Sequence, residues 1–194
     1  MKHIIIAGSA RSGKTTLAAM LKERFPVYNL FHGDCIREWL ISLYGKKRAS
    51  QIVHSDGHAN AMLQLVNAIL KDTKQVYIIE WSRLYPSFVE KIKVHDRCTF
   101  LFLGHGGLSP EKLMKQCREF ETECDFTAEL SDANLLSACK RWANADVRIL
   151  NECISRGETY YNTSRDRMTL FQQIVRSVYK ELHADHETGA ADNK

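Results

Sequence analysis

The sequence lacks a long hydrophobic run, a paired-cysteine motif and a strong excess of charge of either sign. Its apolar stretches fall well short of the roughly 20 residues that a helix needs to cross a bilayer, so we expect no membrane span. The first apolar run ends within a few residues, which is too short for a secretory signal. The six cysteines include no C-x-x-C pair, which argues against a disulfide framework and favours reduced thiols in a cytoplasmic protein.

The charge distribution gives little support for nucleic-acid binding. The net charge is only +4 over 194 residues, and no segment interleaves aromatic with basic residues. Apolar residues make up 44% and charged residues 26% of the chain, which is ordinary for a globular protein of this length. No internal repeat, low-complexity tract or interdomain linker is present. We therefore expect a single domain over residues 1–182 and a disordered polar tail over residues 183–194.

Short apolar runs alternate with helical patterns along the chain. This alternation predicts an α/β fold, a three-layer sandwich around a five-stranded, mostly parallel sheet. The expected strands are 3–7, 27–31, 75–79, 98–103 and 158–161. The expected helices are 14–24, 34–44, 58–71, 86–93, 110–120, 133–156 and 167–182. Because right-handed crossovers place the carboxyl ends of such strands at one edge of the sheet, we expect ligands to bind there.

Residues 8–15 read Gly-Ser-Ala-Arg-Ser-Gly-Lys-Thr and stand between a predicted strand and a predicted helix. This is the phosphate-binding loop, or P-loop, G-x-x-x-x-G-K-[ST]. The glycines permit a tight turn whose N–H groups face phosphates, while Lys14 can reach the β- and γ-phosphates and Thr15 can bind Mg²⁺. The motif predicts binding of a nucleoside triphosphate, and the expected phosphate-binding residues are Gly8, Ser9, Ala10, Arg11, Ser12, Gly13, Lys14, Thr15 and Thr16.

An acidic residue and an arginine follow the second predicted strand. Asp34 could accept a proton from an attacking hydroxyl or hold a water on Mg²⁺. Arg37, one helical turn later, could bind an anionic group through two hydrogen bonds. The alternative interpretation is a helix N-cap followed by a surface arginine, and capping is compatible with a catalytic role.

A second carboxylate ends the third predicted strand. An ionised Glu80 at the end of a buried apolar strand is costly unless a cation or a hydrogen-bond donor lies nearby. We expect Glu80 to bind Mg²⁺ through water or to contact substrate, and Arg83 to contact an anion. The alternative is a plain ion pair between Glu80 and Arg83.

Together, the P-loop, the run Gly33-Asp34-x-x-Arg37 and the acidic end of the third strand resemble the small P-loop kinases of the adenylate kinase-like and shikimate kinase-like group. The resemblance covers most of residues 1–182 in element order, although only the P-loop is a sharp motif. It implies that Asp34 and Arg37 lie on the acceptor side of the cleft. It also implies an adenine-binding loop at Asn162, Thr163 and Ser164.

The resemblance further implies a lid whose arginines stabilise the transferred phosphoryl group. By position the lid would be residues 118–132, but this stretch has Arg118 as its one basic residue and is otherwise acidic. Lys140 and Arg141, on the next predicted helix, would then substitute, and Arg141 is the candidate catalytic arginine. This departure from the family pattern concerns phosphoryl transfer and not nucleotide binding.

Other P-loop classes fit the sequence poorly. It has neither the N-K-x-D nor the D-x-x-G motif of GTPases, and no L-S-G-G-Q signature of transporter ATPases. We therefore expect a kinase that moves the γ-phosphoryl group of MgATP to a nucleotide, nucleoside or small metabolite, with Lys14, Asp34 and Arg141 as catalytic residues. One alternative is a regulatory nucleotide-binding protein or slow ATPase. Another is a polynucleotide 5′-kinase, which no basic stripe supports.

Overall fold

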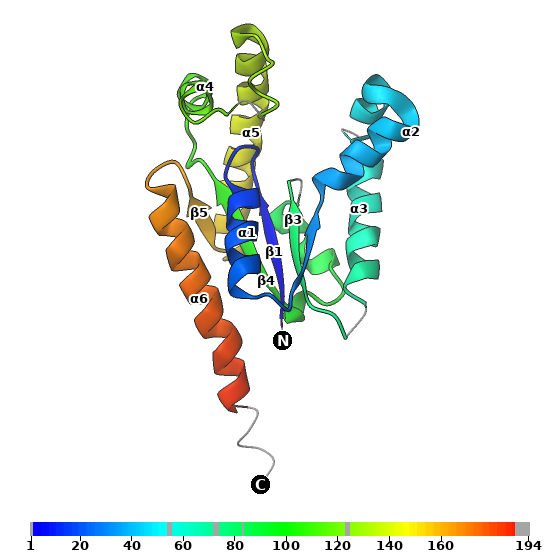
Figure 1. Ribbon diagram of the computed structural model, residues 1–194, viewed down its shortest axis with the longest axis vertical. Coiled ribbons are helices and arrows are strands. Elements are labelled where there is room, and N and C mark those ends of the chain that lie inside the picture. Colours follow the sequence, from blue (N-terminus) through cyan, green and yellow to red (C-terminus); the bar gives the residue numbers. More distant parts are fainter. Residues whose placement is uncertain (1, 54–55, 72–73, 83, 123–124, 189–194) are drawn as a thin grey trace.

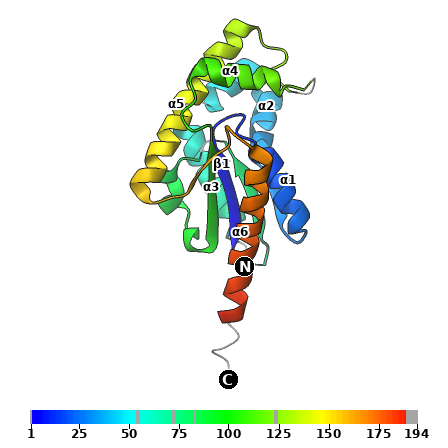
Figure 2. The same ribbon diagram turned by 90° about the vertical axis from the view of Figure 1, so that its left-hand side faces the viewer.

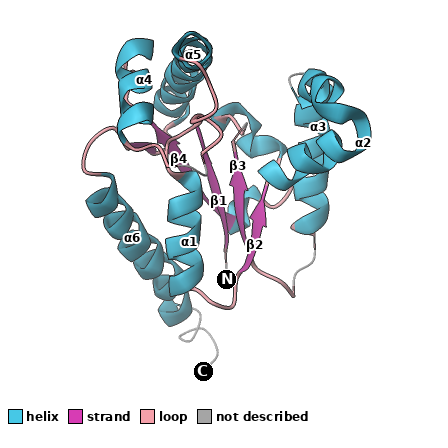
Figure 3. Cartoon of the chain, turned by 45° about the horizontal axis from the view of Figure 1, so that its top comes forward, coloured by secondary structure: helices cyan, strands magenta, loops and turns pink. Residues whose placement is uncertain are grey.

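A computed structural model describes residues 2–53, 56–71, 74–82, 84–122 and 125–188. Five parallel strands form one sheet in the order β2-β3-β1-β4-β5, as Figures 1 and 3 show. The strands are β1 (His3–Gly8), β2 (Asn29–His32), β3 (Tyr77–Trp81), β4 (Cys98–Gly104) and β5 (Tyr160–Asn162). The predicted α/β fold with a five-stranded sheet is thus confirmed.

Helices connect the strands and cover both faces of the sheet. The α-helices are α1 (Lys14–Arg24), α2 (Asp34–Val53), α3 (Asp56–Ile69), α4 (Pro110–Glu119), α5 (Asp132–Arg156) and α6 (Arg167–Thr188). Two short 3₁₀ helices, η1 (Pro86–Lys91) and η2 (His95–Arg97), precede β4. Among the residues described, no helix is both long and apolar enough to span a bilayer.

Alternation along the strands divides the core into two layers. On one face, Ile4 and Ile6 of β1 pack against α1 and α6, where Leu17 and Phe171 are fully buried. On the other face, Ile5 of β1 packs in a cluster with side chains of α3, η1 and α5. Because β1 is covered on both faces, all six of its residues are buried, as expected for a central parallel strand.

The elements around the carboxyl end of β1 project beyond the sheet. In Figures 1 and 2, α4 and the beginning of α5 extend past this end, and Figure 1 places α2 on the opposite side of β1. The P-loop follows β1 at this same edge. The sheet therefore places its loops where parallel α/β proteins bind ligands.

Two helices differ from their expected ends. Helix α2 continues to Val53, because the chain stays helical on both sides of Gly45, whose φ of 75° makes a kink. Helix α6 continues to Thr188, so the first six residues of the expected tail are helical, and residues 189–194 lie outside the described part of the chain. The strands begin and end within about two residues of the expected positions, the usual uncertainty of element boundaries.

Candidate functional site

The P-loop is locked against the neighbouring strand β4. Gly8 has a φ of 147°, and a Cβ there would overlap the carbonyl oxygen of Leu103. The next amide, of Ser9, donates to that same oxygen over 3.1 Å. At the far end, Gly13 has a φ of 84°, and a Cβ would come within 2.7 Å of the Phe171 ring. Glycine is required at both positions because the backbone conformation and the close packing exclude a side chain.

Lys14 begins α1 and is buried, with 5% of its surface exposed. Its ammonium donates to the carbonyl oxygen of Ser9 over 2.7 Å, so it curls back over the loop. Burial lowers the pKa of Lys14, while the negative charges of Glu80 and Asp34 act in the opposite direction. The hydroxyls of Ser9 and Ser12 are buried in the same loop without a hydrogen-bond partner. The P-loop therefore contains buried polar groups and one buried cation, Lys14.

Thr15 and Glu80 meet beside this lysine. The Thr15 hydroxyl donates to Glu80 Oε1 over 2.8 Å, and His32 Nδ1 donates to Glu80 Oε2 over 2.6 Å. The carboxylate is buried, and these two donors satisfy both of its oxygens. Strand register explains the meeting, because His32 pairs with Glu80 across β2 and β3, and Glu80 pairs with Ile6 of β1.

This pair of oxygen groups suits a magnesium ion. Mg²⁺ prefers oxygen ligands and usually keeps several waters while binding through one or two protein groups and the substrate phosphates. Thr15 and Glu80 supply a hydroxyl and a carboxylate at the point where the P-loop enters α1. The residues thus fit the expected assignment of Thr15 as a ligand and Glu80 as a ligand through water.

The expected acceptor-side residues are more exposed. Asp34, the first residue of α2, is exposed and close enough to Lys14 to act on its pKa. Arg37 is also exposed and forms an ion pair with its neighbour Glu38 at 2.7 Å. Arg83 lies outside the described residues. The structure therefore brings Asp34 to the P-loop, leaves Arg37 on the surface of α2, and gives Glu80 the partners Thr15 and His32.

The segment between α4 and α5 contacts the P-loop through a pair that sequence reasoning missed. Arg11, which has a φ of 63°, donates from both terminal nitrogens to the carboxylate of Asp125, with one bond of 3.2 Å. Hydrogen bonds from Arg11 lower the pKa of Asp125 to about 2. The two residues are 114 positions apart, so no local pattern marks them as partners.

The two arginines expected to stabilise phosphoryl charge have other partners. Arg118 donates to Glu121, to Asp132 and to the carbonyl oxygens of Thr127 and Leu130, so it holds its own segment together. Arg141 is exposed on α5 and donates to the carbonyl and hydroxyl of Ser137, one turn earlier. Neither is hydrogen-bonded to the P-loop.

The expected adenine loop lies between β5 and α6. Thr163 is buried, and both its amide and its hydroxyl donate to the carbonyl oxygen of Gly104, at 2.7 and 3.0 Å. Asn162 is exposed, and its side chain accepts from the amide of Ser164. Gln116 of α4 donates to the carbonyl of Ser164 over 3.0 Å. The loop is thus fixed to the end of β4 and to α4.

A buried network behind the loop was also missed by sequence reasoning. Asp146 of α5 accepts from the amides of His105 and Gly107 and from the hydroxyl of Tyr160. His105 bonds through Nε2 to the carbonyl oxygen of Ala10 over 2.9 Å, so this network reaches the P-loop. Burial lowers the pKa of His105, partly opposed by the Ala10 carbonyl and by Asp146. These bonds hold the turn 104–107 in place.

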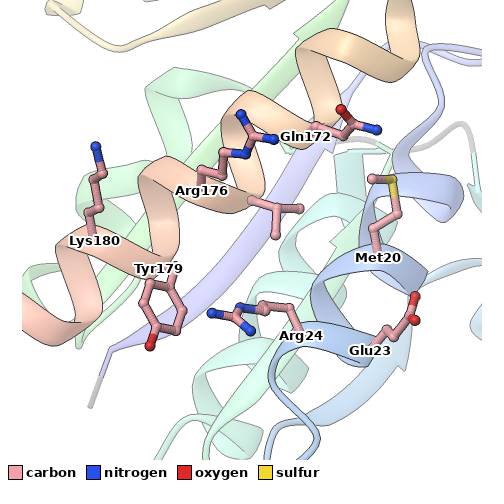
Figure 4. Close-up of a pocket in the computed structure, with 8 residues that line it drawn as sticks. Met20, Glu23, Arg24, Gln172, Arg176, Tyr179 and Lys180 are labelled. Atoms are coloured by element: carbon pink, nitrogen blue, oxygen red, sulfur yellow. The ribbon is translucent and has the colours of Figure 1, made fainter.

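A large surface groove lies elsewhere on the molecule. It has a volume of about 640 Å³ and is formed by α1 and α6, with Arg24 stacked over Tyr179 at 4.1 Å, as Figure 4 shows. Its walls come from residues 20–24 of α1 and 172–180 of α6, away from the P-loop. A much smaller hollow adjoins the P-loop, and its lining residues are Arg11, His105, Leu113, Gln116, Cys117, Phe120 and Arg167.

Solved structures of similar fold are known. A shikimate kinase from Bacteroides thetaiotaomicron is 14% identical with a TM-score of 0.59, over 94% of this chain and 98% of that chain. A sugar kinase from Janibacter is 17% identical with a TM-score of 0.61, over 91% and 93%. A gluconokinase from Sinorhizobium meliloti is 16% identical with a TM-score of 0.54, over 93% and 97%.

No protein-family model matches the sequence, and neither does any curated protein. The structural likeness spans more than nine-tenths of the chain. The chain therefore has the fold of small P-loop kinases, and the resemblance inferred from its motifs is confirmed at the level of the fold.

Proposed function

We propose that this protein is a kinase that transfers the γ-phosphoryl group of MgATP to a nucleotide, a nucleoside or a small metabolite. The observation that carries the proposal is the meeting of Lys14, Thr15 and Glu80 at the carboxyl end of β1 and β3. A buried ammonium, an oxygen pair suited to Mg²⁺ and a glycine-framed loop are the parts that phosphoryl transfer needs on the donor side. The likeness to solved kinase folds supports the same activity.

Each donor-side residue has a defined task. The amides of the P-loop bind phosphate oxygens, and the ammonium of Lys14 moves from the Ser9 carbonyl to the phosphates. Thr15 and, through water, Glu80 would hold the magnesium ion, which neutralises charge on the phosphates when bound. His32 keeps the Glu80 carboxylate oriented through its 2.6 Å hydrogen bond. Because these groups are buried or held by hydrogen bonds, little reorganisation is needed during the reaction.

On the acceptor side, Asp34 is the candidate general base. It stands at the start of α2, near enough to Lys14 to influence its pKa, so an acceptor hydroxyl beside it would face the transferred phosphoryl group. Arg37 is then available for an anionic group of the acceptor if it releases Glu38. Asn162, Thr163 and Ser164 are assigned to the adenine ring, since this loop is fixed beside the P-loop at the end of β4.

A coupled assay of ADP release tests the proposal. The protein is incubated with MgATP and a panel of nucleoside monophosphates, nucleosides, sugars and hydroxy acids. We expect at least one acceptor class to stimulate ADP release, with the phosphate recovered on that acceptor. Slow release that no acceptor stimulates would contradict transfer and support an ATPase.

One observation favours a second candidate, a nucleotide-binding regulator or slow ATPase. Arg118 is bonded within the α4–α5 segment and Arg141 to Ser137, so the expected lid arginines have protein partners. The same acceptor panel separates the two functions, because a regulator would bind MgATP with the same loop and release no acceptor-dependent ADP.

A further inference from the structure

Two arginines lie against the P-loop, and the carboxylates of Asp125 and Glu121 interact with one of them, Arg11. Arg11 belongs to the loop, and Arg167 begins α6 with its Cδ 3.1 Å from the position of a Cβ on Gly13. Both line the small hollow that also includes His105 and Gln116. The buried Lys14 lies in the same loop and affects the pKa of His105, so positive charge is concentrated here.

Arg11 is bonded to the carboxylate of Asp125, which an anionic ligand could replace. The two terminal nitrogens of its guanidinium group donate to both oxygens of Asp125. An arginine binds a phosphate with the same geometry. Burial by itself lowers the pKa of Arg11, but the bonds and charge of Asp125 raise it above its ordinary value. The side chains of Arg11 and Asp125 remain 20% and 24% exposed, so an incoming anion can reach the pair.

Arg167 differs from Arg11 in its partners. Burial, and then the charge of Arg11, lower the pKa of Arg167. Its Nε makes a long bond of 3.4 Å to the carbonyl of Thr163, and among the described residues no carboxylate pairs with it. Arg11 and Arg167 thus repel each other across a hollow, and a polyanion would stabilise both at once.

The hollow is too small to hold a phosphate beside the existing pair. Its volume is about 10 Å³. A phosphate that enters this hollow to contact Arg11 has to displace a group already there, and the carboxylate of Asp125 is the group bonded to Arg11. Gln116, on the rim of the hollow, has a buried Oε1 without a partner, which suits a hydroxyl or amino donor of a nucleoside.

We propose that the side chains of Arg11 and Arg167 bind the phosphates of the nucleotide, and that these phosphates displace the carboxylate of Asp125 from Arg11. The inference rests on the proposed function and assigns to the P-loop and α6 the cationic role expected of the segment 118–132. It also gives Asp125 a role of its own, as an internal competitor that occupies Arg11 until the nucleotide binds. The Arg11 side chain acts here in addition to the loop amides.

Calorimetric titration of MgATP into four proteins tests the exchange. Relative to wild type, Arg11→Gln and Arg167→Gln should each weaken binding about 10- to 100-fold, the usual effect of losing a charge-assisted hydrogen bond. Asp125→Asn should tighten binding about 3- to 10-fold, because a neutral amide competes less well for Arg11. An unchanged affinity in Arg11→Gln, or weaker binding in Asp125→Asn, would overturn the inference.

Matched controls exclude a general effect of charge. Arg176→Gln changes another arginine of α6, and Glu129→Gln changes another exposed acid of the α4–α5 segment; neither should alter the affinity. If wild type binds no MgATP, the proposed function fails with the inference. If wild type binds and Lys14→Ala does not, but Arg11→Gln binds like wild type, only the inference fails.

A charge swap separates phosphate binding from a merely structural pair. The double variant Arg11→Asp with Asp125→Arg keeps one ion pair between the loop and the α4–α5 segment. We expect its thermal midpoint to return toward wild type while its MgATP affinity stays at least as weak as that of Arg11→Gln. Recovery of both properties would show that Arg11 acts only as a structural tether and would overturn the inference.

Discussion

The donor side and the acceptor side of the candidate site are built differently. Lys14 and Glu80 are nearly fully buried, and the P-loop is fixed by contacts of its glycines with β4 and α6. On the acceptor side, Asp34 and Arg37 are exposed on α2, beside the edge strand β2. The donor side is therefore a buried polar site, whereas the acceptor side is exposed on a surface helix.

The two sides have different physical tasks. Binding a triphosphate requires inward-facing amides and a desolvated cation, which only a rigid, packed loop provides. Choosing an acceptor requires side chains that can differ without disturbing the core, and an exposed helix such as α2 meets that need. Damage to the donor side should therefore abolish activity, while changes on the acceptor side should alter transfer and leave nucleotide binding intact.

The largest effect is expected at the buried cation of the donor side. Lys14→Ala should reduce turnover by about 10²- to 10³-fold, since it removes a main electrostatic stabiliser of phosphoryl charge. Lys112→Ala, which changes an exposed lysine of α4, is the control and should be neutral. The measurement is acceptor-dependent ADP release, and equal rates for the two variants would place the phosphates elsewhere.

The acceptor side should separate transfer from binding. Asp34→Asn is expected to lower turnover about 100-fold, a typical loss of general-base assistance, while MgATP affinity stays within about twofold. Glu129→Gln, at an exposed acid of the α4–α5 segment, provides the comparison. Single-turnover rates check the loss of transfer, and calorimetry on the same samples checks the MgATP affinity. A fully active Asp34→Asn would remove Asp34 from catalysis.

Glu80 should give a smaller, magnesium-dependent effect. Glu80→Gln removes the charge that faces Thr15 and His32, so we expect the Mg²⁺ concentration for half-maximal activity to rise about 10-fold, as for loss of an outer-sphere partner. High Mg²⁺ should restore much of the rate. If the variant shows the wild-type Mg²⁺ dependence, Glu80 has only a structural role.

The smallest effect concerns acid stability. Burial lowers the pKa of His105 and of His3 below the ordinary value of 6.5, so the folded protein binds these protons less readily than the unfolded chain does. Above about pH 6.5 the neutral histidines contribute in full to the free energy of unfolding. This contribution is lost as the pH falls, by at most about 1.4 kcal/mol per pH unit for one histidine. Thermal midpoints between pH 7 and 5.5 should therefore fall more steeply for wild type than for His105→Gln. His95→Gln, at an exposed histidine, should follow wild type.

The sequence predicted those parts of the molecule that depend on local pattern. The five strands, helix 14–24 and the P-loop follow from apolar periodicity and from one motif. Glu80 was singled out because it was expected to end a buried strand, and in the structure it is the penultimate residue of β3. The continuation of α2 beyond Gly45 was missed, because a glycine with positive φ normally ends a helix and here only kinks it.

Contacts between distant segments could not be predicted in the same way. His32 reaches Glu80 only through the register of β2 on β3, and Arg11 reaches Asp125 across 114 residues. The acidic character of residues 121–132 was visible, but its meaning depends on an arginine in the P-loop. Pairings of this kind are set by tertiary packing, so only the three-dimensional structure shows them.

Calorimetric titration of the folded wild-type protein with MgATP, with Lys14→Ala titrated in parallel, tests whether the P-loop binds a nucleoside triphosphate. We expect saturable binding of one nucleotide by wild type and a loss of that binding in Lys14→Ala. A folded wild-type protein that gives no heat of binding with MgATP or with any other common nucleoside triphosphate would contradict it.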